Sequence, residues 1–261
     1  MSPANSSQED DRLILDITPP QSLCSDPSAS QTFILDNGDT ISYSTYGPAF
    51  NDAIFLLHGW SGSRMHGLFF HSLAEELGAR IICPDRPGIG LSTPSPNRTL
   101  LDYPNTIAQL ARHLDLNTYR ILGWSGGGPF VLACAQILSR EQLLRVSVLA
   151  EMGSSDTSLD ESEWVRGEEK KDLEDLFAAD PGAMEVKIES LLLGSWGFDL
   201  KSLEAEVMLW YGTADINVSI LVGREMAKKL KKAKLKEYEG IAYFTIFKHH
   251  AKEILRDLLQ D

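Results

Sequence analysis

The sequence predicts an α/β fold in which helices cover both faces of a mostly parallel β-sheet. The first observation is a set of short segments whose central residues are mostly apolar, which is typical of strands buried on both faces. These segments are 52–59, 79–85, 118–124, 143–151 and 205–212. The second observation is that helical patterns of apolar residues alternate with the strands, which favours parallel pairing through helical crossovers. The predicted helices cover residues 66–78, 105–116, 127–138, 219–231 and 245–259.

Two further segments add strands to this sheet. Residues 31–47 predict a β-hairpin, because apolar and polar residues alternate around the turn residues Asn37 and Gly38. Residues 235–240 predict a short strand just before the last helix.

The chain divides into three predicted parts. Residues 1–29 are rich in Ser, Asp and Pro and lack sustained periodicity, so they predict a mostly disordered arm. The α/β core is expected to comprise residues 30–151 and 198–261. Residues 152–197 break the alternation with an acidic stretch and two helical patterns, which predicts a small helical cap over one end of the sheet. A long surface connection is the alternative for this segment.

Composition limits the classes of function. The chain has 261 residues, of which 43% are hydrophobic and 23% charged, as in globular proteins. A net charge of −13 argues against binding to nucleic acid or to anionic membranes. Three scattered cysteines, no secretory pattern and no membrane-spanning apolar run predict a cytoplasmic protein, which we expect to be a monomer or homodimer. No metal-ligand spacing or cofactor fingerprint occurs, so we expect neither group.

The strongest motif is the G-x-S-x-G segment 123–127, which lies between a predicted strand and a predicted helix. A tight turn at this place would present the hydroxyl of Ser125 at the carboxyl edge of the sheet. The flanking glycines leave room for the turn, and the N-terminus of the following helix favours developing negative charge.

A second motif, His58-Gly59-Trp60, follows the strand 52–57. A glycine-rich loop here can aim a backbone N–H at the same point as the turn around Ser125. We therefore predict an oxyanion hole formed by the N–H groups of Trp60 and Gly126. His58 is predicted to be structural, because it precedes the loop and should point back beneath it.

With two further motifs, these features resemble the α/β-hydrolase superfamily over about residues 31–260. The segment 85–92, DRPGIGLS, is similar to a turn that follows the fourth strand in many members, and 212–215, GTAD, is similar to the turn that carries the acid. The resemblance implies an eight-stranded sheet, a cap between strands six and seven, and a Ser–His–Asp triad. Ser125 would be its nucleophile and Asp215 its acid.

The sequence departs from this family where the histidine should stand. Tyr243 occupies that place in the segment after the last strand. A phenol, with a pKa near ~10, donates hydrogen bonds at neutral pH but removes protons poorly. Three histidines are candidate replacements: His66 could face the cleft, His250 is predicted to be half-buried, and His249 is predicted to be solvated. Glu151, after the strand that precedes the cap, is the alternative to Asp215 as the acid.

Three kinds of function remain open. The first is an esterase-like serine hydrolase that acts on a small to medium hydrophobic ester or lactone with an atypical triad. The second is a lyase, isomerase or cyclase, as in natural-product biosynthesis, that uses Tyr243 and the oxyanion hole without an acyl-enzyme. The third is a ligand-binding protein that has lost catalysis. An ordinary hydrolase in which Tyr243 is a substitution is a further alternative.

Four residues are predicted to contact a hydrophobic substrate. His66 and Trp124 lie near the predicted oxyanion hole, and Trp164 and Trp196 belong to the predicted cap. The alternative is that the cap tryptophans only pack the cap onto the sheet.

Overall fold

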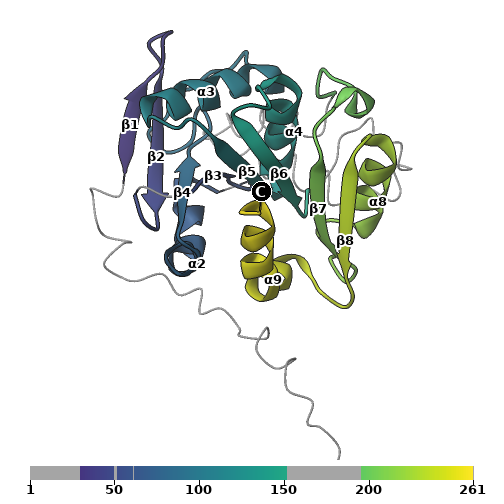
Figure 1. The fold of residues 1–261 in the computed structure, drawn as a ribbon. Coiled ribbons are helices and arrows are strands. Elements are labelled where there is room, and N and C mark those ends of the chain that lie inside the picture. The colour runs from purple at the N-terminus through teal and green to yellow at the C-terminus, as the bar shows by residue number, and fades with distance from the viewer. Residues whose placement is uncertain (1–29, 50–51, 61, 152–194, 261) are drawn as a thin grey trace, which may run out of the picture.

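The computed structural model describes residues 30–49, 52–60, 62–151 and 195–260, which form an eight-stranded sheet between two layers of helices (Figure 1). The strand order is β1-β2-β4-β3-β5-β6-β7-β8. The two pairs β1/β2 and β2/β4 are antiparallel, and all the others are parallel. The strands are β1 (Gln31–Ile34), β2 (Thr40–Tyr46), β3 (Asp52–Leu57), β4 (Ala79–Pro84), β5 (Tyr119–Trp124), β6 (Leu143–Leu149), β7 (Val207–Gly212) and β8 (Ala233–Tyr238). The predicted mostly parallel, eight-stranded sheet is therefore confirmed.

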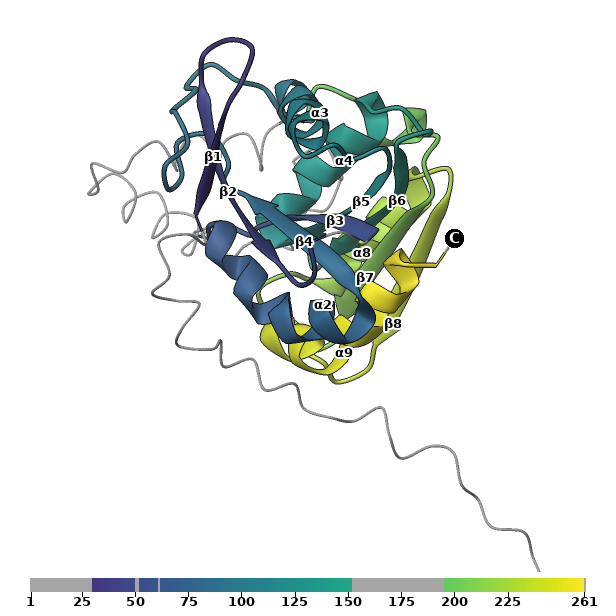
Figure 2. The same ribbon diagram turned by 60° about the vertical axis from the view of Figure 1, so that its left-hand side comes forward.

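Helices cover both faces of this sheet, as the continuous apolar strands predict. Helices α3, α4 and α8 pack on one face, and α2 and α9 pack on the other (Figures 1 and 2). The α-helices are α2 (His71–Leu77), α3 (Tyr103–His113), α4 (Gly128–Ile137), α8 (Ile220–Lys229) and α9 (Tyr243–Leu258). Short 3-10 helices are η2 (Arg64–Phe70), η3 (Leu100–Asp102), η4 (Ser125–Gly127) and η6 (Leu200–Ser202).

Strand β5 lies at the centre of the sheet, and every one of its residues is buried. Its neighbours β3 and β6 run parallel to it, so the carboxyl ends of all three strands meet at one edge of the sheet. Loops at this edge of an open parallel sheet carry binding sites in many α/β proteins. The segments after β3, β5, β7 and β8, which hold the predicted site residues, all start there.

Two predicted elements differ from the observed ones at their boundaries. Residues 66–78 form a 3-10 stretch followed by α2 rather than a single helix. The tight packing of Gly67 explains part of this difference, because a Cβ there would lie 2.2 Å from the ring of Tyr46. The last helix begins at Tyr243 and not at Thr245, because the Thr245 hydroxyl bonds back to the N–H and carbonyl of Ala242 and caps the helix.

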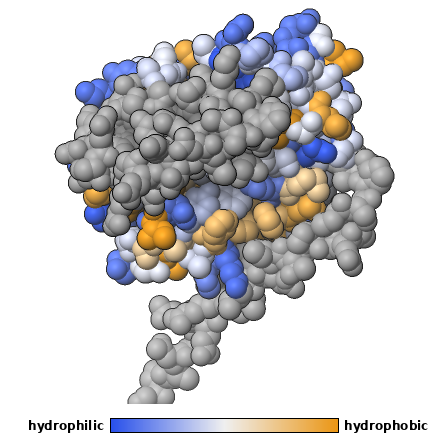
Figure 3. Space-filling view, turned by 180° about the vertical axis from the view of Figure 1, so that it is seen from behind, coloured by the Kyte–Doolittle hydropathy of each residue, from blue (hydrophilic) through white to orange (hydrophobic). Residues whose placement is uncertain are grey.

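The predicted arm, residues 1–29, and most of the predicted cap, residues 152–194, lie outside the described part of the chain. Within the described ranges, no helix is both long and apolar enough to cross a membrane. On the back of the molecule, apolar patches lie among polar ones (Figure 3). Large apolar side chains that stay exposed include Ile34, Ile216 and Phe244.

Candidate active site

The turn after β5 holds Ser125 in a left-handed backbone conformation, with φ of 52°. Residues other than glycine rarely adopt such a conformation, and they keep it only where surrounding structure enforces it. The strand ends at Trp124, η4 follows without a linker, and α4 begins at Gly128. The sharp strand-to-helix turn predicted from the sequence is therefore present, and Ser125 is 6% exposed.

Close contact with β3 holds this turn in place. A Cβ on Gly127 would lie 2.1 Å from the carbonyl oxygen of Leu57, so only glycine fits there without movement. A Cβ on Gly59 would lie 3.3 Å from the Cβ of Ser125. The loop that carries Trp60 therefore touches the serine, as the predicted oxyanion hole requires.

Buried polar side chains fix the loop after β3 from beneath. The Nδ1–H of His58 donates to the carbonyl of Gly59 at 2.9 Å, and its Nε2 accepts the backbone N–H of Arg86 at 3.3 Å. The Arg86 guanidinium donates to the carbonyls of both His58 and Gly59. Burial, together with the Arg86 charge, holds the pKa of His58 well below its usual value, so this ring is neutral. His58 thus supports the loop, in line with its predicted structural role.

Sequence reasoning did not give Arg86 a role in the site. It belongs to the segment 85–92, whose sequence indicates only the family resemblance. The side chain is fully buried and also lies over the ring of Phe130, 5.1 Å from its centroid. An arginine directly after the apolar segment 79–85 is the sequence signal that could have identified it.

Asp215 follows β7 and is held by the backbone of its own loop. Its Oδ1 accepts the N–H groups of Asn217 at 2.8 Å and Val218 at 2.9 Å. Its Oδ2 is buried and has no hydrogen-bond partner in the part of the chain that the structure describes. Burial raises the pKa of this carboxyl above its usual value, although the two backbone donors oppose the shift. One carboxylate oxygen is thus hydrogen-bonded to the backbone, and the other can still accept a hydrogen bond or a proton.

Tyr243 lies beside the serine, and its hydroxyl makes no direct hydrogen bond to the Asp215 carboxylate. Its side chain hydrogen-bonds with that of Ser125, and Asp215 is close enough to act on it electrostatically. The N–H of Ala214 donates to the carbonyl of Ile241 at 3.0 Å, which ties the two loops together. Burial raises the pKa of Tyr243 to about 12, so its phenol keeps its proton at neutral pH. The structure therefore brings together the three residues that the sequence singled out.

An aromatic cluster packs behind these residues. Trp124 is 4% exposed, and its ring stacks on Phe247 at 5.3 Å and on Tyr243 at 6.0 Å between centroids. His66 approaches the same indole at 5.1 Å. Trp124, a predicted substrate contact, thus lies mainly inside the protein and supports Tyr243 from behind.

None of the six histidines, all of which lie in the described ranges, has a hydrogen bond to Ser125 there. His66 lies beneath Gly62, and burial lowers its pKa to about 4, so it is neutral at pH 7. His250 stacks on Tyr238 at 3.7 Å and lies 3.4 Å from Glu253, on the side of α9 that faces β8. The ring of His249 lies 6.4 Å from that of His250, between centroids.

The remaining predicted residues lie in other surroundings. Glu151 is buried against the start of α4, where a Cβ on Gly128 would overlap it, and its carbonyl accepts the Tyr211 hydroxyl at 2.9 Å. Trp196 is buried beside Phe198, and Trp164 lies outside the described residues. The described ranges hold no group of three or more His, Cys, Asp or Glu side chains that could bind a metal ion.

Comparisons with known proteins bear on the family of this chain. A family model described as the alpha/beta hydrolase fold matches residues 52–176. The chain is 25% identical to a pimeloyl-[acyl-carrier protein] methyl ester esterase of Chromobacterium violaceum, over 79% of this chain and 92% of that protein.

Solved structures support the same fold. A hydrolase from Pseudomonas aeruginosa PA01 superposes with a TM-score of 0.66 at 15% identity, covering 90% of this chain and 100% of the other. The esterase RhEst1 from Rhodococcus sp. ECU1013 gives a TM-score of 0.62 at 19% identity, covering 88% and 99%.

The contact between Gly127 and β3 predicts a steric effect that can be isolated. Gly127→Ala should lower the free energy of unfolding by more than about 2 kcal/mol, because its Cβ would overlap a backbone oxygen. Gly240→Ala is the control, since Gly240 has φ of 68° but open space around it, and it should cost only about 1–2 kcal/mol. Urea unfolding of both variants measures the difference. Equal losses would contradict the steric account.

The raised pKa of Asp215 predicts a pH-dependent gain in stability on neutralisation. A carboxyl whose pKa is raised on folding opposes folding once it ionises, so the opposition is present at pH 7 and absent below the unfolded pKa of ~3.9. Asp215→Asn keeps an oxygen for the two backbone donors, so it should raise the free energy of unfolding at pH 7. The gain should disappear by about pH 3.5. Unfolding curves at both pH values test this, and a loss at pH 7 would show that the charge is compensated.

Proposed function

Because the chain belongs to the α/β-hydrolase superfamily, we propose that it is an esterase-like enzyme in which Ser125 attacks the carbonyl carbon of a small to medium apolar ester or lactone. One observation carries this proposal. Ser125, Tyr243 and Asp215 are neighbours at the carboxyl edge of the sheet, and the serine lies against the loop that carries Trp60. The serine thus has a partner for its proton and a place for the carbonyl oxygen.

The proton of Ser125 needs a route that does not depend on imidazole. Tyr243 cannot hold an extra proton, but a phenol can accept one while it gives up its own. In the proposed step, the Ser125 O–H bond breaks as Oγ bonds to the carbonyl carbon. The proton moves to the Tyr243 oxygen, and the phenol proton passes through a bridging water to Oδ2 of Asp215, because the phenol has no direct hydrogen bond to that oxygen. The raised pKa of Asp215 makes it a better acceptor, and Oδ2 has no competing partner among the described residues.

Two backbone N–H groups are proposed to stabilise the oxyanion that forms. The N–H groups of Gly126 and Trp60 would bind the former carbonyl oxygen, and each such donor contributes about 3 kcal/mol to a tetrahedral transition state. The conformation of Ser125 and the contact with Gly59 support this role, because they bring both segments to the same point.

The surroundings favour an apolar substrate. Ile216 directly follows Asp215 and is 96% exposed, and Phe244 directly follows Tyr243 and is 68% exposed. Two large apolar side chains at the edge of the site can cover the acyl or alcohol part of an ester. Two of the proteins compared above are esterases by name, which agrees with this class of substrate.

A second function is favoured by the protonated state of Tyr243. A neutral phenol beside an oxyanion hole can donate to an enolate, as a lyase, isomerase or cyclase without an acyl-enzyme would require. In that reaction, Ser125 would serve as a hydrogen-bonding group and not as a nucleophile.

The cellular context is also proposed. Cys83 and Cys134 are buried free thiols, and burial raises the pKa of each above its usual value. Unpaired thiols support a reducing, cytoplasmic location. We propose that the protein works there as a monomer or homodimer.

Covalent labelling tests the role of Ser125. A fluorophosphonate probe should label the wild-type protein slowly at a single site and leave Ser125→Ala unlabelled. Tyr243→His should accelerate labelling by at least about 100-fold, because a base with a pKa near 7 contributes 10²–10⁴-fold and Oδ2 of Asp215 is free to orient it. Intact-protein mass spectrometry measures each rate. A wild-type protein that stays unlabelled while Tyr243→His reacts would restrict the native site to non-hydrolytic chemistry.

The pH profile of labelling tests the proposed proton route. The wild-type rate should fall as pH drops through the raised pKa of Asp215, and this fall should be absent from Asp215→Asn. Tyr243→His should acquire an inflection between about pH 6 and 8, where imidazole titrates. Tyr243→Phe, which removes only the hydroxyl, should label more slowly than wild type. An inflection near pH 7 that persists in Asp215→Asn would point to a histidine base and contradict the phenol route.

A further inference from the structure

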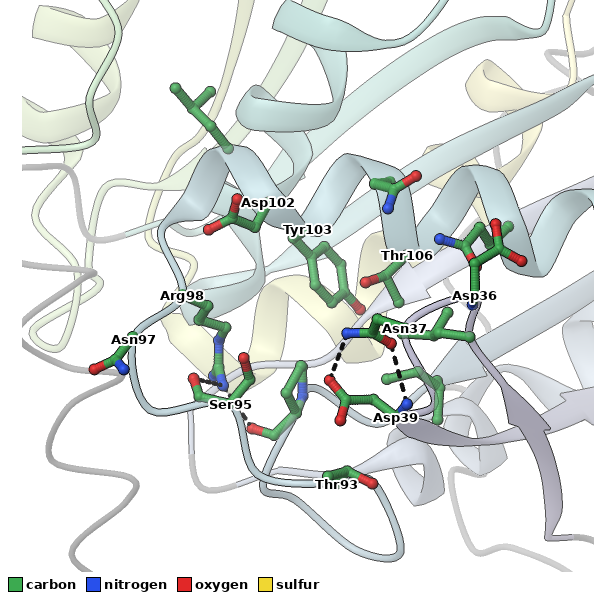
Figure 4. A pocket seen from close by; sticks show the side chains of 16 residues that line it. Asp36, Asn37, Asp39, Thr93, Ser95, Asn97, Arg98, Asp102, Tyr103 and Thr106 are labelled. Atoms are coloured by element: carbon green, nitrogen blue, oxygen red, sulfur yellow. Dashed lines mark hydrogen bonds between the residues drawn. The ribbon is translucent and has the colours of Figure 1, made fainter.

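A cavity of about 570 Å³ lies away from Ser125, between the tip of the β1–β2 hairpin and the start of α3 (Figure 4). Ser125, Tyr243 and Asp215 do not line it. Its volume is in the range of pockets that hold small ligands. Most of the side chains around it are polar, so its chemistry differs from the apolar surroundings proposed for the serine site.

Arg98 in the wall of this cavity lacks a carboxylate partner within the described ranges. Its Nη1 donates to the carbonyls of Pro87 at 2.8 Å and Ser95 at 3.4 Å. Its Nε and Nη2 are buried and have no hydrogen-bond partner there. By contrast, each of five other arginines forms an ion pair, namely Arg64, Arg112, Arg120, Arg145 and Arg224. Two buried guanidinium nitrogens of Arg98 thus remain without a hydrogen-bond partner at the wall of a polar cavity, and a ligand could satisfy them.

Three carboxylates line the same cavity, but each of them forms its hydrogen bonds or ion pair with a residue other than Arg98. Asp102 accepts from the N–H and hydroxyl of Thr99, which it caps. Asp39 accepts from the amide of Asn37 at 2.8 Å, and Asp36 pairs with Arg112 on the surface. None of these three acids therefore forms an ion pair with Arg98.

Tyr103 adds a second unused polar group. It is the first residue of α3 and is 1% exposed, and its hydroxyl has no hydrogen-bond partner among the described residues. A buried hydroxyl without a partner costs about 1–3 kcal/mol in typical proteins, so such groups are seldom kept without a use. In Figure 4, the Tyr103 ring reaches down from α3 into the space between Arg98 and Asp39, which stand on opposite sides.

We propose that this cavity binds a small zwitterion of the amino-acid class. Arg98 and Tyr103 would bind the ligand's carboxylate, and Asp39 would bind its ammonium group. Guanidinium and phenol donors suit a carboxylate, and both Arg98 and Tyr103 line the cavity; binding through Nη2 requires the Arg98 side chain to turn from its present buried position. A simple anion is disfavoured because it would meet three carboxylates and one guanidinium. An ammonium group on the ligand removes that repulsion.

Matched ligands test this inference on the full-length protein carrying Ser125→Ala, so the result does not depend on the proposed esterase activity. L-leucine, glycine and L-glutamine are the amino-acid probes. 4-Methylpentanoate and 3-methylbutylamine are the controls, because they keep only the carboxylate or only the ammonium group of leucine. At ten times its dissociation constant, an amino acid should raise Tm by about 3 °C, and the two controls should not. Isothermal titration calorimetry gives the dissociation constants.

Three variants locate the binding. Tyr103→Phe removes one hydroxyl from a buried ring, and Asp39→Asn removes one charge at equal size, so both should fold and each should weaken binding at least about tenfold. Arg98→Gln should abolish it. Arg140→Gln, an exposed arginine outside the cavity, is the control and should bind like the parent. The inference is overturned if no amino acid binds at about 20 mM, if 4-methylpentanoate binds equally well, or if Tyr103→Phe and Asp39→Asn bind like the parent.

Discussion

The positive φ of Ser125 and the close approach of Gly127 to Leu57 are the constraint on which the site depends. A strained conformation lasts only when packing around it leaves no alternative, and here β3 closes against the turn with no room for a Cβ. The same contact brings the loop of Gly59 and Trp60 to the serine. One packing requirement thus fixes both the direction of the hydroxyl and the position of the backbone donors. A shift of the turn away from β3 would lose both together.

The phenol at position 243 changes the electrostatics of the site more than its layout. An imidazole would donate to Asp215 and share its charge, whereas Oδ2 now lies buried without a partner in the described residues. Burial then works against the carboxylate and raises its pKa. The protein therefore keeps an acid that opposes folding at neutral pH. Asparagine would satisfy the same backbone donors without this cost. The presence of aspartate is therefore easier to understand if its charge is used in proton transfer.

The sequence predicted the sheet well because parallel strands buried on both faces carry a strong apolar signal, as β3 and β5 do. The resemblance to the α/β-hydrolase superfamily implied that Ser125, Asp215 and the residue at position 243 meet, and each of them does follow a strand at the same edge. Prediction from the sequence failed where tertiary packing decides the local conformation or the direction of a side chain. Nothing local indicates that residues 64–70 tighten into a 3-10 helix. The prediction of Trp124 as a substrate contact relied on its position beside Ser125, but the pleat of β5 directs its ring toward α9.

The position of residue 243 is set by the helix that it begins. Ile246, Phe247 and Ile254 of α9 are buried against the sheet, and Thr245 caps the first turn. These contacts fix the backbone of α9 whatever side chain stands at its first position. Tyr243 then meets Ser125 on one side and Trp124 on the other, because α9 delivers it there. A scaffold that positions a residue independently of its identity lets a phenol take the place of an imidazole without dispersing the other parts of the site. The chemistry at this edge of the sheet can therefore change by a single substitution while the fold stays the same.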